Sequence, residues 1–144
     1  RPDVALFGEK DYQQLQVISA LAADLELGAE IVGMPTIREA DGLAMSSRNS
    51  YLSPTERQRA LGLSKGLFTA QRLAKAGEAD VAKLIAAIRA ELQAVEARED
   101  YVELCDARTL RPLTRLEKGR PGRALVAAFV GTTRLIDNLA VELG

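Results

Sequence analysis

Two short stretches of the sequence gather residue types that suit the binding of an anion. "FGEKDYQQ" (residues 7–14) places a glycine turn and Lys10 at a helix start, and "GLAMSSRNSYLSP" (residues 42–54) places two serines and Arg48 before another. Helix N-termini favour negative charge, lysine adds a mobile positive charge, and arginine makes bidentate contacts to phosphate. The chemistry that these residues indicate is phosphate binding.

Each stretch also has a purely structural interpretation. Lys10 could be a surface lysine in an ordinary strand-to-helix turn, with Asp11 as the N-cap and Gln14 completing a capping box. Residues 45–50 could be a solvated connector, because linkers are often rich in serine and asparagine. Residue types alone favour these structural interpretations over a binding site.

The overall composition excludes several classes of function. With 19 basic and 20 acidic residues, the chain has no charge excess that would attract nucleic acid or a membrane surface. It contains no histidine, which excludes histidine-based triads and most zinc sites. Asp24, Glu26 and Glu30 are too scattered to form a metal site, so we expect any Mg²⁺ to arrive on ligand phosphates.

The single cysteine and the hydropathy pattern bear on the location of the protein. Cys105 rules out an intramolecular disulfide, fits a reducing compartment, and is expected to be a packed thiol rather than a nucleophile. No apolar run approaches the roughly 20 residues of a membrane span, and no signal peptide precedes the first strand. We expect a cytoplasmic protein with no membrane partner.

A strand, a helix and a second strand are expected to position the first stretch. Val4–Phe7 is a short apolar run that predicts a buried strand, and residues 11–27 carry one apolar face typical of a helix ending at Gly28. A second strand is expected over residues 30–35, which makes a βαβ unit. Open α/β sheets bind ligands at the carboxyl ends of their strands, where Lys10 lies.

A second group of elements follows the serine-rich stretch. Ser53, Pro54 and Glu56 form a specific helix start, and two helices that share a seam are expected over residues 54–76 and 79–97. Period-two patterns predict strands in residues 100–107, 123–131 and 132–142, with a bend at Gly131. The expected domains are residues 1–49 and an α+β domain over residues 50–144, which contains a small antiparallel sheet.

Four segments resemble the family of pantothenate synthetases, the pantoate–β-alanine ligases: "DVALFGEKDYQQLQVI", "EIVGMPTIREADGLAMSSRNSYLSPTER", "YVELCDARTL" and "GTTRLIDNL". The second segment is the most specific. The resemblance runs from Arg1 to Gly144 and covers the C-terminal half of the family's usual length. It implies an α/β remnant of a Rossmann-like nucleotidyltransferase domain followed by a small α+β lobe, with residues 45–49 standing in place of a KMSKS-type loop.

The resemblance also implies a reaction. Pantoate would attack the α-phosphate of ATP to give pantoyl adenylate and pyrophosphate, and the amine of β-alanine would then displace AMP. Mg²⁺ would accompany ATP as its counter-ion. The full-length protein would be a cytoplasmic homodimer acting in the coenzyme A pathway.

Roles for individual residues follow from the same resemblance. Lys10 would neutralise phosphate charge, Gln14 would hydrogen-bond pantoate, and Ile37 would contact adenine through its backbone. Two groups of residues would bind the nucleotide. The turn after the first strand would line the nucleotide site with Gly8, Glu9, Lys10 and Asp11. A second segment would close over the phosphates with Met45, Ser46, Ser47 and Arg48. The residues expected to act in catalysis are Lys10, Ser46, Ser47 and Arg48.

The family's HxGH signature is absent, because the chain has no histidine. We therefore expect the isolated chain to be inactive and the activity to belong to the full-length protein. Two alternatives remain open: a folded binding module without catalysis, and a related adenylating ligase with another acid substrate.

Overall fold

The structure is a computed structural model that describes residues 2–144 and divides into two compact units. The first unit ends at Ile37, and the second runs from Arg38 to Gly144. Each unit has its own sheet, with parallel strands in the first unit and antiparallel strands in the second.

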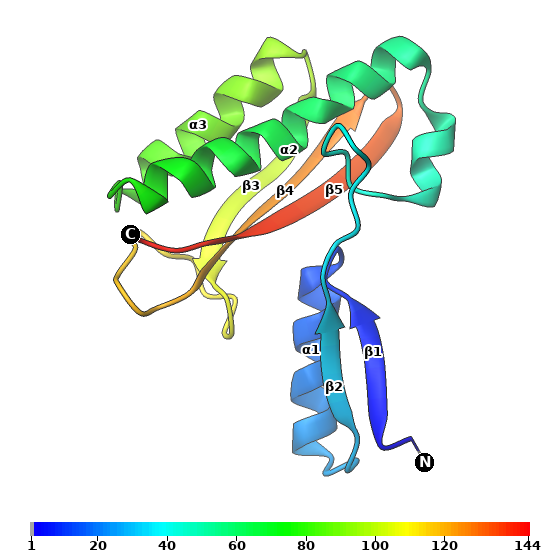
Figure 1. The fold of residues 1–144 in the computed structure, drawn as a ribbon, viewed down its shortest axis with the longest axis vertical. Coiled ribbons are helices and arrows are strands. Elements are labelled where there is room, and N and C mark those ends of the chain that lie inside the picture. The colour runs from blue at the N-terminus through cyan, green and yellow to red at the C-terminus, as the bar shows by residue number, and fades with distance from the viewer. Residues whose placement is uncertain (1) are drawn as a thin grey trace. The chain divides into compact units, whose positions relative to one another are not determined.

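The first unit is a βαβ arrangement. Strand β1 (Val4–Gly8), helix α1 (Tyr12–Asp24) and strand β2 (Glu30–Met34) follow one another along the chain. The strands pair in parallel, and α1 packs against both of them (Figure 1). The predicted parallel pair and its crossover helix are confirmed.

Helix α1 starts without the capping box that the sequence predicts. Asp11 occupies the N-cap position, but its side chain accepts no hydrogen bond from the first turn. Its ψ of 71° lies outside the extended region that aims an N-cap side chain at the helix N–H groups. The predicted side-chain cap of Asp11 was therefore wrong. The predicted stop at Gly28 was wrong as well, because the helix ends at Asp24 with Leu25 as its C-cap, and Glu26 already has a positive φ of +48°.

The second unit is an α+β lobe. It contains a short 3₁₀ helix η1 (Ser47–Tyr51), two long helices and three strands: α2 (Pro54–Lys75), α3 (Val81–Ala94), β3 (Arg98–Asp106), β4 (Gly122–Val130) and β5 (Thr133–Val141). The strands form an antiparallel sheet in the order β3-β4-β5. Figure 1 shows α2 and α3 side by side across one face of that sheet. The predicted antiparallel sheet and helical layer are confirmed.

Local signals account for the start of α2 and for the tight turn of the sheet. The Ser53 hydroxyl accepts from the Glu56 N–H at 3.1 Å, and the Glu56 carboxylate accepts from the Ser53 N–H at 3.0 Å, so the predicted capping box is present. Strands β4 and β5 join through a two-residue turn between Val130 and Thr133, where Gly131 has φ of +59°.

The hydrophobic core of the second unit lies between the helical layer and the sheet. Most of its largest fully buried side chains come from these two layers, among them Leu67, Leu84, Ile88, Leu92, Leu104, Val126, Val130 and Val141. Helices α2 and α3 approach closely at Gly66, where an added Cβ would lie 3.1 Å from the Cα of Ile88. The predicted seam between the two helices is thereby confirmed.

The compact units divide earlier along the chain than the predicted domain boundary, which follows residue 49. Arg38 hydrogen-bonds to Asp137 and to the Asn138 carbonyl, so the segment after Ile37 packs with the second unit. Assigning residues 38–49 to the nucleotide-binding domain stays a prediction about function.

Candidate functional site

The first group of predicted site residues lies in the turn between β1 and α1. Gly8 is the last residue of β1, and the Glu9 N–H donates to the Met34 carbonyl at 2.8 Å, which ties the turn to the end of β2. Lys10 is half-buried in this turn, and Gln14 is exposed in the first turn of α1. These residues therefore meet at the carboxyl ends of two parallel strands, where α/β sheets bind ligands.

Close packing of α1 on β2 sets the position of this turn. A Cβ added at Gly33 of β2 would lie 2.9 Å from the Cδ2 of Leu15 and 3.2 Å from the Glu9 side chain. A larger residue at this position would have to displace the side chains of Leu15 and Glu9. Leu15 is buried, and its neighbour Gln14 is turned to the surface.

Ile37 is the last residue of the first unit and is 70% exposed. Its side chain packs against no core. The contact predicted between its backbone and adenine does not involve this side chain, so that contact stays a prediction.

The second group of predicted site residues begins η1. The Ser46 hydroxyl accepts from the Arg48 N–H at 3.2 Å and caps the short helix, and the Asn49 N–H donates to the Ser46 carbonyl at 3.1 Å. Met45 is 52% exposed, and Ser47 is exposed as well. The serine-rich stretch is thus an ordered turn of helix rather than an irregular connector.

Arg48 exposes its guanidinium on this turn. Within residues 2–144 it pairs with no carboxylate, whereas Arg38 pairs with Asp137 at 2.7 Å. The structure brings Gly8, Lys10 and Gln14 together in the first unit, and it brings residues 45–48 together in the second. Each unit's predicted segment therefore carries one basic side chain, the half-buried Lys10 in the first unit and the exposed Arg48 in the second.

The cysteine contributes no reactive group. Cys105 is 2% exposed, and burial together with the neighbouring Glu103 and Asp106 carboxylates raises the pKa of its thiol to about 11. At neutral pH the thiol stays protonated, so Cys105 is a packed side chain, as its sequence context predicts.

Two residues that the sequence does not assign to the site make contacts close to residues 45–48. Arg38 and Asp137 form an ion pair next to the segment that leads into η1, although 99 positions separate them in the chain. Arg134 of the same strand pairs instead with Asp100, at 3.0 Å. No local pattern could have linked Arg38 with Asp137.

A family model described as pantoate-beta-alanine ligase matches residues 1–140. The chain belongs to this family. It is 68% identical over 139 residues to the pantothenate synthetase of Myxococcus xanthus and 59% identical over 138 residues to that of Anaeromyxobacter dehalogenans. Each alignment covers 96% of this chain, but 48% of the first relative and 47% of the second. The chain thus spans about half the length of these relatives and corresponds to their C-terminal half.

Solved structures of pantoate–β-alanine ligases share this fold. The Thermus thermophilus pantothenate synthetase is 45% identical with a TM-score of 0.89, covering 98% of this chain and 50% of that one. The Francisella tularensis pantoate-beta-alanine ligase, complexed with "Beta-gamma ATP" and β-alanine, is 27% identical with a TM-score of 0.64, covering 96% of this chain and 43% of that one. The predicted family and fold class are both confirmed.

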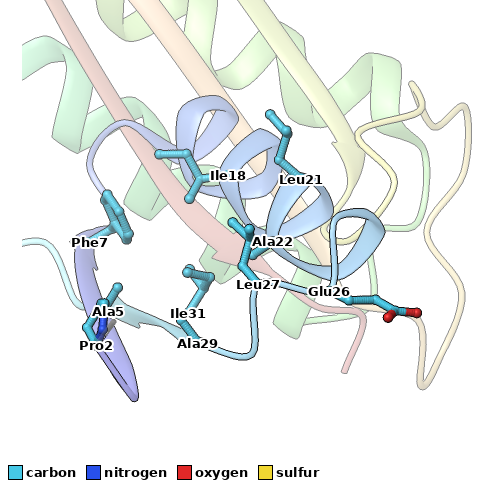
Figure 2. Close-up of a pocket in the computed structure, with 10 residues that line it drawn as sticks. All are labelled: Pro2, Ala5, Phe7, Ile18, Leu21, Ala22, Glu26, Leu27, Ala29 and Ile31. Atoms are coloured by element: carbon cyan, nitrogen blue, oxygen red, sulfur yellow. The ribbon is translucent and has the colours of Figure 1, made fainter.

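The first unit of this pantoate–β-alanine ligase chain also carries a hollow that differs in chemistry from the predicted site. It has a volume of about 680 Å³ and lies beside the sheet face that α1 covers. Phe7 of β1 and Ile18 of α1 are among the residues that line it. Figure 2 shows apolar side chains around it, with the carboxylate of Glu26 at its edge. Phosphate binding needs N–H groups and cations, so this hollow does not suit the phosphates of a nucleotide.

Proposed function

We propose that this chain is the C-terminal half of an ATP-dependent ligase that joins pantoate and β-alanine to make pantothenate in the cytoplasm. The observation that carries the proposal is the family match over residues 1–140, supported by 68% identity to the Myxococcus xanthus pantothenate synthetase. Nucleotide and β-alanine in the Francisella tularensis structure support the substrate classes. The activity is that of the full-length protein, in a homodimer, and the isolated chain is inactive.

The reaction has two steps. A carboxylate oxygen of pantoate forms a bond to the α-phosphorus of ATP, and the bond from that phosphorus to the bridging oxygen breaks, releasing pyrophosphate. The β-alanine amine then forms the amide bond to the acyl carbon, AMP leaves, and the amine loses its proton. The first step does not call for a strong base in this half, because positioning and charge stabilisation assist transfer to phosphorus.

The turn after β1 would hold the nucleotide and pantoate. Lys10 would neutralise the charge that develops on the phosphates, while Gly8 would let them approach the backbone; open space around a Cβ added at Gly8 supports this assignment. Glu9 and Asp11 would line the same site. Gln14, exposed one turn into α1, would hydrogen-bond pantoate.

The segment Met45–Arg48 would close over the phosphates. The exposed Arg48 guanidinium supports this role, because it is available for bidentate contacts to phosphate oxygens. The hydroxyls of Ser46 and Ser47 would add donors, and the Ile37 backbone would contact adenine.

Mg²⁺ would accompany ATP and supply charge neutralisation on its phosphates. Among residues 2–144, no three or more His, Cys, Asp or Glu side chains cluster so as to hold a metal ion. We therefore assign no step to the metal here. Nor is any helix in the same described range long and apolar enough to cross a membrane.

The test of this function uses the corresponding full-length protein with pantoate, β-alanine and ATP. We expect pantothenate and AMP as products, and we expect Lys10→Ala and Arg48→Ala each to slow adenylate formation roughly 100-fold or more, as loss of a transition-state donor does. The matched control is Lys65→Ala, which removes an exposed lysine of α2. Unchanged adenylation rates in both variants would remove these residues from the mechanism.

The alternatives separate in the same assay and in one binding experiment. A full-length protein that forms AMP with another acid but not with pantoate would be a related adenylating ligase. A full-length protein that forms no adenylate with any acid would favour a binding module. Calorimetry of the 144-residue chain with ATP and Mg²⁺ then measures how much nucleotide affinity this half retains.

A further inference from the structure

Arg38 and Asp137 form a bidentate ion pair inside the second unit. The Arg38 Nη1 lies 2.7 Å from one Asp137 oxygen, and Nη2 lies 2.9 Å from the other. Their side chains are only 16% and 3% exposed. The same guanidinium donates to the Gly42 carbonyl at 3.0 Å and to the Asn138 carbonyl at 3.3 Å, so it joins a loop to β5.

The place of Asp137 in its strand is unusual for a carboxylate. Along β5, side chains of alternate residues share a face, and Leu135, Leu139 and Val141 on the face of Asp137 all pack into the core. A buried carboxylate needs a partner, and Arg38 supplies it from the segment before η1.

Arg38 also closes the base of that segment. Residues 38–44, which we call the stem, fold back on themselves, with the Glu39 N–H donating to the Leu43 carbonyl at 2.8 Å and a bridge between Arg38 and Ala44. Leu43 and Ala44 are each 5% exposed. The stem is therefore an ordered part of the second unit rather than a free linker.

Helix α2 holds the stem from a second side. Arg57 pairs with the carboxylates of Glu39 and Asp41, and the Arg38 guanidinium lies 5.2 Å from the centre of the Phe68 ring. Of these ion pairs, the Arg38–Asp137 pair is the least exposed.

The proposed phosphate-binding segment follows the stem without a break. Met45 comes directly after Ala44, and the Asn49 side-chain amide donates back to the Ala44 carbonyl at 3.0 Å. At the other end of η1, the capping box of Ser53 and Glu56 fixes the start of α2. The segment is therefore anchored at both ends to the second unit.

We propose that Arg38 and Asp137 are positioning residues for the segment Met45–Arg48, which they hold on the second unit through the stem. This inference rests on the proposed function of that segment. It means that Arg48 approaches phosphate as part of the α+β lobe, and that its placement depends on a carboxylate almost at the end of the sequence.

The decisive variant removes the whole pair. In Arg38→Met alone, Asp137 is left buried without a cation, and we expect the whole chain to lose stability. In Arg38→Met with Asp137→Leu, no charge remains buried, and we expect stability close to that of the original chain. Backbone amide exchange at Leu43, Arg48 and Asn49 should nevertheless become about 10-fold faster or more in this double variant.

Controls separate positioning from stability. Leu84→Ala removes a fully buried side chain of α3, and it should lower global stability while leaving exchange in the stem and η1 unchanged. Arg38→Lys keeps the charge but loses the bidentate fork, and we expect exchange between that of the original chain and the double variant. If the double variant does not fold, Arg38→Lys decides the question, because original exchange rates there would overturn the proposal.

Original exchange rates in a stable double variant would also overturn it, since the pair would then be structural only. In the full-length protein, the double variant should lower kcat for adenylation about 10-fold or more and leave KM for pantoate unchanged, because Gln14 lies in the first unit. A raised KM with unchanged kcat would contradict positioning of the segment. A full-length protein that forms no pantoyl adenylate would instead contradict the proposed function and leave the exchange result standing.

Discussion

At the scale of single residues, the arginines differ in what their guanidinium groups contact. Arg38, Arg120 and Arg134 each pair with a carboxylate, whereas Arg48 pairs with none in the described part of the chain. Exposure alone does not set Arg48 apart, because Arg72 is exposed too. The functional assignment of Arg48 therefore depends on the order of residues around it.

Asp106 offers a test of electrostatics away from the proposed site. Its carboxylate accepts from the Thr109 and Arg108 N–H groups at 2.9 Å each and from Arg120 Nε at 2.9 Å. These donors, with the Thr109 N–H first, hold the pKa of Asp106 well below its ordinary value of 3.8. The charged carboxylate therefore stabilises the folded state above about pH 4. This contribution is lost as the pH falls toward the lowered pKa of the folded state.

We expect Asp106→Asn to lower the free energy of unfolding at pH 6, with a difference from the original chain that shrinks between pH 4 and pH 2.5. Urea unfolding at pH 6, 4, 3 and 2.5 measures the difference. Asp100→Asn is the control, because Asp100 pairs with Arg134 at an exposed position where ion pairs contribute little. A difference for Asp106→Asn that does not change with pH would contradict the assigned cause.

At the scale of elements, the sequence predicts what local chemistry decides. The start of α2 was predictable because Ser53, Pro54 and Glu56 satisfy the helix N-terminus among themselves. The 3₁₀ helix Ser47–Tyr51 was not, because five residues carry no helical period. For the candidate site, the order of residues within the motifs was enough to predict the site residues. The ion pair that holds the stem was not predictable in this way, because it joins residues 99 positions apart. Such a contact depends on the folded sheet and has no local signal.

The seam between α2 and α3 gives a prediction at this scale. At Gly66, an added Cβ would lie 3.1 Å from the Ile88 Cα and 3.2 Å from its carbonyl oxygen, and backbone atoms cannot rotate away. Alanine is favoured over glycine in helices by about 1 kcal/mol, but overpacking costs typically about 1–3 kcal/mol.

We therefore expect Gly66→Ala to lower the free energy of unfolding by about 1 kcal/mol, although helix propensity alone predicts a gain. Thermal or urea unfolding of the 144-residue chain measures it. Lys65→Ala, at the neighbouring exposed position, should change stability little. A more stable Gly66→Ala variant would mean that the helices separate easily at this position.

At the scale of the whole molecule, the two units differ in how much apolar surface they bury. Among residues 2–37, three side chains are buried, Tyr12, Leu15 and Ala22, while Val4 and Leu6 of β1 are 48% and 62% exposed. Two-stranded sheets are marginal alone, and parallel sheets are normally covered on both faces. Because the relatives are about twice as long as this chain, we expect their other half to cover the apolar surface that α1 leaves exposed, together with the apolar hollow, in the full-length protein.

This difference predicts separate opening of the two units. In the 144-residue chain, we expect backbone amides of β1 and β2 to exchange roughly 100-fold faster than those of β4, whose side chains are nearly all buried, because few apolar contacts oppose local opening of the first sheet. In the corresponding full-length protein the exchange of β1 and β2 should slow toward that of β4, since the added polypeptide covers their apolar side chains. Hydrogen exchange followed by mass spectrometry on both proteins measures this change, with β4 as the internal reference. Equal protection of β1 and β4 in the 144-residue chain would mean that the first unit is stable without further cover.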